Sequence, residues 1–349
     1  MIGSASAGCA AEAAEPVEAN VVVGTSEPTI FGGSKDDDQE SLPGVVALRV
    51  GTGGTFELCS GALVAPNVVL TARHCVTQNL TTSISCDENG QSANGEHVKA
   101  TQDPAAVGVY LGATPSFAKA PISKARAIVA PSGKYLCDSD IALVVLDRNL
   151  DDVPTLPLRI HSPARAGEKI RSVGYGQNDK SVPIGTRFRK DGVPVLAQGK
   201  AVSASKTPLG PHEFEVGKSI CQGDSGGPAI SEATGAVIGV VSRGGKCDED
   251  FGHIYTTTAG FEDLFEQAFE LAKSEPTLEP GDAEAGQARA RSKAASPMPS
   301  EESTASAGGC AISGATHTNG RSASALVGLA VAIAAVRARR RVDGTRRVR

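Results

Sequence analysis

The chain has 349 residues and a net charge of −5 at pH 7, and 40% of its residues are hydrophobic. Residues 30–309 hold 26 basic and 34 acidic residues, whereas residues 310–349 hold eight Arg and one Asp. An acidic body of this kind argues against a nucleic-acid partner, which needs a basic face. The 40 glycines and 20 prolines favour short strands joined by turns.

Residues 1–29 are rich in Ala and Glu, and we interpret them as a propeptide or a disordered N-terminal segment. They contain no apolar stretch of the length that a secretory signal requires. The segment Ser6-Ala7-Gly8-Cys9 is similar to the end of a lipoprotein signal. Two interpretations stay open: a chain that starts upstream with Cys9 lipidated, or an ordinary cysteine in a disordered tail.

Between residues 42 and 258 short apolar runs alternate with Gly, Pro, Asn and Asp, which predicts an all-β double barrel. The segment 77–104 is long and polar and is predicted to be a surface loop. A helix is expected over 261–271, with an apolar face that packs on the core, because apolar residues recur there at helical spacing: Phe261, Leu264, Phe265 and Ala268.

The most specific motif is the octapeptide Cys221-Gln222-Gly223-Asp224-Ser225-Gly226-Gly227-Pro228. Its glycines allow a tight turn that brings backbone N–H groups close to a reacting atom. A serine held in this way can attack a carbonyl carbon while those N–H groups stabilise the oxyanion. Such a nucleophile needs a base and an orienting carboxylate. The candidates are His74, after the apolar run 68–70, and Asp140, before the apolar run 141–146.

The order His74, Asp140, Ser225 resembles that of the trypsin/chymotrypsin-like serine proteases, and the resemblance covers residues 30–274. It implies two six-stranded Greek-key β-barrels packed together, followed by a C-terminal helix. Four further segments carry the resemblance: Ile30-Phe31-Gly32-Gly33, Cys59-Ser60-Gly61-Ala62-Leu63, Gly174-Tyr175-Gly176 and Val240-Val241-Ser242.

The resemblance implies that Ser225 is the nucleophile, His74 the general base and Asp140 the residue that orients His74. The backbone N–H groups of Gly223 and Ser225 would form the oxyanion hole. Taken singly, His74 could be a surface histidine and Asp140 a turn residue at a strand start, but together with the octapeptide they favour a triad. Arg73 replaces the Ala that usually precedes the histidine, and the sequence offers no physical account of it.

By the same resemblance, Ile30 and Asp224 form an activation pair. In the family, cleavage before the Ile frees an ammonium that pairs with the Asp preceding the nucleophile, because a buried charge needs a partner. The bond here is Thr29–Ile30, without a Lys or Arg before it. We therefore expect a zymogen that is activated by a protease of other than trypsin-like specificity.

The specificity pocket departs from the trypsin pattern. Ser219 takes the place of an Asp at the pocket base, which disfavours Lys or Arg in a substrate. His253 falls at or next to a pocket-lining position, and Arg243 replaces the usual Trp in Ser242-Arg243-Gly244. We favour apolar substrate side chains. Acidic substrate side chains are the alternative, because Ser219 with His253 could bind a carboxylate and Arg243 would favour one. If the alignment with the family shifts by one residue, His253 instead faces the other side of its strand.

Eight cysteines indicate an oxidising compartment. The resemblance implies three disulfides inside the domain, the third of which has two free thiols as its alternative: Cys59–Cys75, Cys221–Cys247 and Cys86–Cys137.

Residues 275–309 are rich in Pro, Ala, Ser, Glu and Gly and are predicted to be a disordered linker. Gly308-Gly309-Cys310 then precedes an apolar run, 323–336, which is short for a membrane span of about 20 residues. With its Arg-rich end, segment 310–349 resembles the MYXO-CTERM type of sorting signal. That resemblance implies transient membrane anchoring and sorting machinery that acts near Cys310. A permanent tail anchor is the alternative.

The sequence as a whole predicts a serine endopeptidase of proteins or peptides that is secreted or delivered to the outer surface of a Gram-negative-type cell. The alternative is a non-catalytic binding or adhesion module on a protease fold. An esterase is disfavoured because Ser225 lacks the Gly-x-Ser-x-Gly elbow. No metal or organic cofactor is expected, although the run Asp36-Asp37-Asp38 allows a calcium site or a solvated loop.

Overall fold

The computed structural model describes residues 30, 32–36, 42–52, 55–177, 182, 184–200 and 206–295. The expected propeptide, the sorting signal with Cys310, and Cys9 lie outside the described residues. So do Phe31, Asp37 and Asp38.

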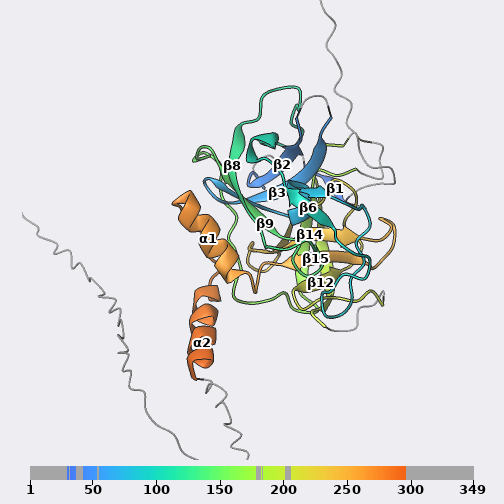
Figure 1. Ribbon diagram of the computed structural model, residues 1–349, viewed down its shortest axis with the longest axis vertical. Coiled ribbons are helices and arrows are strands. Elements are labelled where there is room, and N and C mark those ends of the chain that lie inside the picture. Colours follow the sequence, from blue (N-terminus) through green and yellow to red (C-terminus); the bar gives the residue numbers. More distant parts are fainter. Residues whose placement is uncertain are drawn as a thin grey trace, which may run out of the picture. The chain divides into compact units, whose positions relative to one another are not determined.

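Six strands from the first half of the domain close into an antiparallel barrel (Figure 1). Along its first strand, Val46 and Leu48 enter a cluster inside this barrel, while Val45 and Ala47 join a cluster that includes residues of the second barrel. This alternation follows from the two-residue period of a strand. The order around the barrel is β2 (Val45–Val50), β3 (Glu57–Ala65), β4 (Val68–Thr71), β9 (Ala142–Leu146), β8 (Ser123–Val129) and β7 (Val107–Tyr110).

Six strands from the second half close a second barrel, in which the last strand pairs back with the first, and the two-residue strand β1 (Ser34–Lys35) pairs with β11. The all-β, two-barrel fold predicted from the sequence is therefore confirmed. The order is β11 (Phe188–Gln198), β10 (Lys169–Gly174), β13 (Pro228–Ser231), β14 (Val237–Gly244), β15 (His253–Thr257) and β12 (Glu213–Val216).

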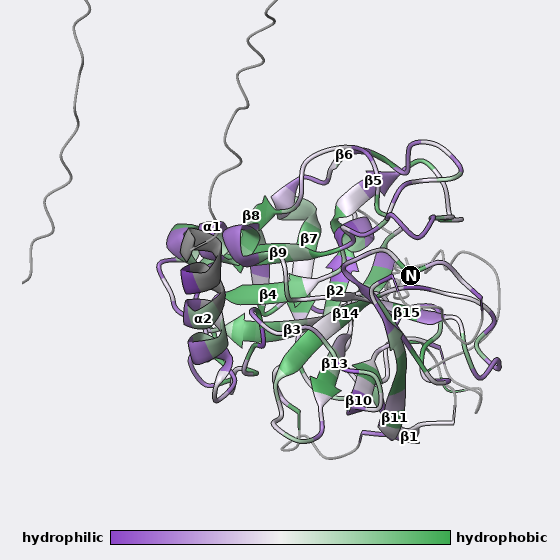
Figure 2. Cartoon of the chain, turned by 90° about the horizontal axis from the view of Figure 1, so that it is seen from below, coloured by the Kyte–Doolittle hydropathy of each residue, from purple (hydrophilic) through white to green (hydrophobic). Residues whose placement is uncertain are grey.

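Short elements complete the domain. The polar segment 77–104 contains a two-stranded ribbon, β5 (Thr77–Asn79) and β6 (Val98–Thr101), and two 3-10 helices flank it: η1 (Arg73–Val76) and η2 (Pro104–Ala106). The predicted C-terminal helix is α1 (Glu262–Ala272), and Figure 2 shows hydrophobic residues gathered in the strands and hydrophilic ones along the helices. The face of α1 that packs on the core carries Phe265, Ala268, Phe269 and Ala272.

Tyr175 and Arg187 join the second barrel to the first. The hydroxyl of the buried Tyr175 lies 2.9 Å from the carbonyl oxygens of both Val45 and Gly112. Nη1 of Arg187 donates to the same Val45 carbonyl, and its Nε donates to the Asp36 carboxylate over 2.7 Å. Asp36 is itself buried, so the expectation of a solvated loop is wrong at this position.

The prediction of a disordered linker is wrong for the first part of that segment. After α1 the chain forms an ordered stretch, residues 278–282, which we call the strap, and it continues into a helix, α2 (Asp282–Ala295). Glu279 accepts hydrogen bonds from Nε and Nη2 of Arg159 at 2.5 and 2.7 Å. Asp282 accepts from the backbone N–H of Ile160 at 2.7 Å. The polar composition of this segment does not reveal that Glu279 and Asp282 accept hydrogen bonds from buried donors elsewhere in the domain.

None of the helices within the described ranges is both long and apolar enough to cross a membrane. The apolar run 323–336 lies outside those ranges.

Candidate active site

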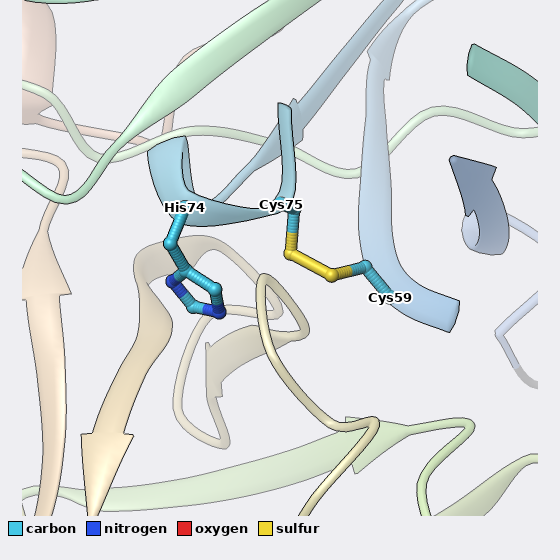
Figure 3. A group of neighbouring side chains, drawn as sticks. All are labelled: Cys59, His74 and Cys75. Carbon is cyan, nitrogen blue, oxygen red and sulfur yellow. A yellow bond between two sulfur atoms is a disulfide. The ribbon is translucent and has the colours of Figure 1, made fainter. Parts of the chain in front are cut away.

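His74 lies in η1, directly after β4, whose four residues are all buried. The Cys59–Cys75 disulfide ties this turn to β3 (Figure 3). The two sulfur atoms and a ring nitrogen of His74 lie within 4.8 Å of one another, a spacing that could suit a metal ion. Because the sulfurs are bonded to each other, neither is a thiolate that could bind a metal. The disulfide instead fixes the turn that carries His74.

Asp140 precedes β9 and is buried, and it receives three hydrogen bonds that fix its orientation. The ring Nδ1 of His74 lies 2.8 Å from Asp140 Oδ2, and the backbone N–H of His74 donates to Oδ1 over 2.9 Å. The hydroxyl of Ser242, on β14, donates to Oδ2 over 2.8 Å. Because Nδ1 carries the hydrogen that is donated to the carboxylate, the other ring nitrogen, Nε2, is the basic one.

The electrostatics of the pair favour charge on both groups. Burial opposes protonation of His74, but the charge and hydrogen bond of Asp140, together with the charge of Glu57, raise the pKa of His74 above its usual value. Burial likewise opposes ionisation of Asp140, yet the attraction of His74 and the hydrogen bonds from His74 and Ser242 together lower the pKa of Asp140. His74 is thus a strengthened base beside an ionised carboxylate.

Ser225 lies just before β13, and its loop contacts the segments that lead to His74. The backbone N–H of Ser60 donates to the Ser225 carbonyl over 2.8 Å. Gly226 has a φ of 75°, and a Cβ added there would lie 2.1 Å from Thr71 Oγ1 and 2.6 Å from the Ser60 carbonyl oxygen. Only glycine allows this approach, which holds the loop against the end of β4.

The loop around Gly223 exposes two backbone donors. Gly223 has a φ of 89°, and its carbonyl accepts a hydrogen bond from the hydroxyl of Ser60 over 3.0 Å. That hydroxyl also accepts from the backbone N–H of Tyr175 over 2.9 Å. Across the described part of the chain, the backbone N–H groups of Gly223 and Ser225 donate to no protein group. They are therefore available to a ligand oxygen.

Asp224 is fully buried beside Ile30. Its carboxylate accepts from the backbone N–H groups of Gly176 and Cys221, both over 2.9 Å, and from that of Ile30. A Cβ at Gly174 would lie 2.2 Å from Asp224 Oδ1, so this close packing requires glycine. Burial raises the pKa of Asp224 to about 7, although the backbone hydrogen bonds oppose the rise. The structure thus brings together the two residues expected to form an activation pair.

Comparison with known families decides the classification of this site. The sequence model of the family described as Trypsin matches residues 30–264. The chain belongs to the trypsin family of serine peptidases. It is 28% identical to a trypsin of Squalus acanthias over 238 residues, 64% of this chain and 89% of that protein. It is 32% identical to the cercarial protease of Schistosoma mansoni over 202 residues, 54% of this chain and 70% of that protein.

In this member of the trypsin family, Ser219 and His253 are both completely buried. Nε2 of His253 donates a hydrogen bond to the carbonyl oxygen of Glu249 over 2.9 Å. Burial lowers the pKa of His253, and the nearby Lys190 lowers it further, while Glu215 and Glu249 oppose this. His253 is therefore neutral at pH 7 and does not provide a cation for an acidic substrate group.

Arg243 has an internal partner, contrary to the expectation that it would face acidic groups of a substrate. Its Nη1 and Nη2 both donate to the carboxylate of Glu213, and the Nη2 bond measures 2.8 Å. The Glu213 side chain is fully buried, whereas that of Arg243 is 11% exposed. Two-point pairing of this kind fixes the guanidinium and neutralises its charge. Sequence reasoning missed Glu213, which carries no motif.

All three disulfides expected inside the domain are present, which excludes the alternative of two free thiols: Cys59–Cys75, Cys221–Cys247 and Cys86–Cys137. The third joins the inserted segment 77–104 to the loop that leads to Asp140. Asp138 in that loop has a φ of 58° and accepts from the backbone N–H of His212, while its own N–H donates to Glu213 over 3.1 Å. The Asp140 loop is thus fixed from two sides.

Ser60 is a further residue whose role the sequence did not reveal. Its backbone contacts Ser225, and its hydroxyl connects Gly223 to Tyr175. The sequence did contain a hint of this role, because Ser60 lies in segment 59–63, which carries part of the family resemblance. That segment marks a strand, but it does not show where the hydroxyl points.

Proposed function

We propose that this protein is a serine endopeptidase that hydrolyses peptide bonds through Ser225, His74 and Asp140. The observation that supports it most is the chain of hydrogen bonds from Ser242 to Asp140 to His74. It lies next to a serine loop whose backbone N–H groups at 223 and 225 have no acceptor among the residues that the structure describes. A binding module would need neither an ionised carboxylate behind a histidine nor unoccupied donors beside a serine.

The reaction would proceed in two steps. Ser225 Oγ bonds to the peptide carbonyl carbon while its proton moves to Nε2 of His74, and the carbonyl oxygen becomes an anion held by the two N–H groups. His74 then passes the proton to the leaving amine, which breaks the peptide bond and leaves an acyl-enzyme. A water molecule repeats the sequence and releases the acid, while Asp140 stabilises the imidazolium.

The proposed activation step uses Ile30 and Asp224. Cleavage of the Thr29–Ile30 bond would replace an uncharged amide beside Asp224 with an ammonium. Because an ammonium stabilises a buried carboxylate, cleavage would ionise Asp224 and rigidify the loop that carries residues 223 and 225. Thr29 makes a trypsin-like activator unsuitable, and another protease is the proposed partner.

The pocket contacts support apolar substrate residues over acidic ones, as favoured from the sequence. Ser219 is uncharged, His253 is neutral, and the positive charge of Arg243 is balanced by Glu213. Export, transient anchoring through the C-terminal segment and sorting near Cys310 complete the proposal, and they rest on the sequence alone.

Active-site labelling tests the function. Protein that begins at Ile30 is treated with a fluorophosphonate, and peptide mapping locates the adduct. We expect labelling at Ser225, none in Ser225→Ala, and a rate reduced by orders of magnitude in His74→Gln. A folded protein beginning at Ile30 that takes up no label at Ser225 would favour the non-catalytic module.

A further inference from the structure

Arg73 connects the two segments that carry His74 and Asp140. It directly precedes His74 and is only 3% exposed. Its Nη1 donates to the carbonyl of Tyr135 over 2.9 Å, and its Nη2 donates to the carbonyl of Gly133 over 2.6 Å. Both carbonyls belong to the loop between β8 and β9, which leads to Asp140. The guanidinium therefore forms a second connection between these segments, beside the direct His74–Asp140 bond.

Further hydrogen bonds link the carbonyl groups of Tyr135 and Arg73 to residues next to the candidate triad. The carbonyl of Tyr135 also accepts from the hydroxyl of Ser139, the residue before Asp140, over 3.1 Å. At the other end, the hydroxyl of Thr77 donates to the Arg73 carbonyl over 3.0 Å and closes η1. Displacement of the guanidinium would therefore affect the backbone on both sides.

Arg73 also places a positive charge near the pair. Burial lowers the pKa of Arg73 while Asp140 opposes that shift, and an arginine in such a site stays charged at neutral pH. By reciprocity, its charge favours the ionised form of Asp140. Because like charges repel, we expect it also to oppose protonation of the adjacent His74. Among the described residues, Glu57 also attracts the imidazolium of His74, and His97 interacts with Asp140.

We propose that Arg73 is a positioning residue for the peptidase reaction, which fixes His74 relative to Asp140 and supplies a constant positive charge behind them. The inference rests on the proposed function. Arg73 acts through its contacts with the backbone and through its charge. It accounts for an arginine at a position where the family resemblance leads one to expect alanine.

Kinetics of three variants test the inference. Arg73→Met removes both the donors and the charge. Arg73→Lys retains the charge but loses the planar guanidinium that donates to two carbonyls. Arg126→Met is the matched control, because Arg126 also donates to two backbone carbonyls, those of Leu146 and Leu271, at the opposite end of β9. We expect Arg73→Met to lower kcat by roughly 10- to 100-fold with KM nearly unchanged, and Arg126→Met to leave both unchanged.

A titration separates positioning from a purely structural role and does not require turnover. The pKa of His74 is followed by NMR in a Ser225→Ala background. Arg73→Met should raise it by about half a pH unit or more, and Arg73→Lys should leave it in place. If Arg73→Met does not fold, Arg73→Gln removes the charge while keeping an amide donor. A His74 pKa that is the same with and without the charge overturns the inference.

The two readouts distinguish the possible failures. If the parent protein cleaves no peptide and takes no label, the proposed function fails, while the NMR titration still decides whether Arg73 acts on His74. If the parent protein is active and the Arg73→Met and Arg126→Met variants behave alike, the inference about Arg73 fails on its own.

Discussion

The buried carboxylate of Glu213 binds both outer nitrogens of Arg243, one residue from the Ser242 that donates to Asp140. β14 therefore carries an arginine whose positive charge is balanced by a neighbouring carboxylate. A substrate carboxylate would have to compete with a fixed, desolvated partner for this cation.

Selectivity should change when that partner is neutralised. In Glu213→Gln, the positive charge of Arg243 becomes available, and we expect kcat/KM for a peptide with Glu near the cleaved bond to rise about tenfold relative to its Gln counterpart. The double variant Glu213→Gln/Arg243→Met should return to the parent ratio. An unchanged Glu-to-Gln ratio in the single variant would mean that Arg243 does not face the substrate.

The pH dependence of activity should reflect the raised pKa of His74. The base must be neutral to accept the proton of Ser225, so activity is lost as pH falls through that pKa. Because Asp140 raises it, the acidic limb of kcat/KM should lie above about 6.5, the usual value for histidine. In Asp140→Asn the limb should move to lower pH, and kcat should fall roughly 10⁴-fold, as it does in the chymotrypsin triad. A limb at the same pH in both proteins would contradict this account.

Asp224 should make the uncleaved protein less stable as pH rises. Its pKa is about 7 in the folded chain and near 3.9 when unfolded, so the folded state binds the additional proton between these values. The free energy of unfolding therefore decreases as pH increases from about 4 to about 7. Urea unfolding at several pH values should show this slope in the intact chain and a flatter one in Asp224→Asn. Equal slopes in the two proteins would show that Asp224 does not titrate in this range.

The strap that follows α1 should contribute to the stability of the second barrel. Glu279→Ala removes one carboxylate from the buried Arg159, which retains Glu168 at 2.8 Å, and we expect a loss of about 1–3 kcal/mol. Glu284→Ala, at an exposed position on α2, is the matched control and should change little. Thermal unfolding of the two variants checks the difference, and equal melting temperatures would show that the strap is dispensable.

The sequence predicted the fold and most of the candidate site because these depend on local constraints. The glycines next to Ser225 are required by backbone contacts closer than any side chain allows, and such constraints leave a recognisable motif. Strand alternation is equally local. The disulfide pairings and the triad roles came from the resemblance that these motifs carry, and for Cys86–Cys137 the sequence left two free thiols open.

The contacts that sequence reasoning missed join residues far apart in the chain. Arg73 contacts carbonyls of residues 133 and 135, Glu213 pairs with Arg243, and Glu279 pairs with Arg159. Each partner is an ordinary charged residue without a motif. The charge of Arg243 was visible in the sequence, but its neutralisation depends on how β12 and β14 lie beside β15.

The end of the ordered domain also limits how far that domain can lie from Cys310. Helix α2 ends at Ala295, and the residues from there to Cys310 number 14. Fully extended, a chain of that length spans about 50 Å at most. If the protein is held at Cys310, the end of α2 can lie no more than about 50 Å from the point of attachment. The enzyme would then act on proteins of the same surface or on those that come within that distance of it.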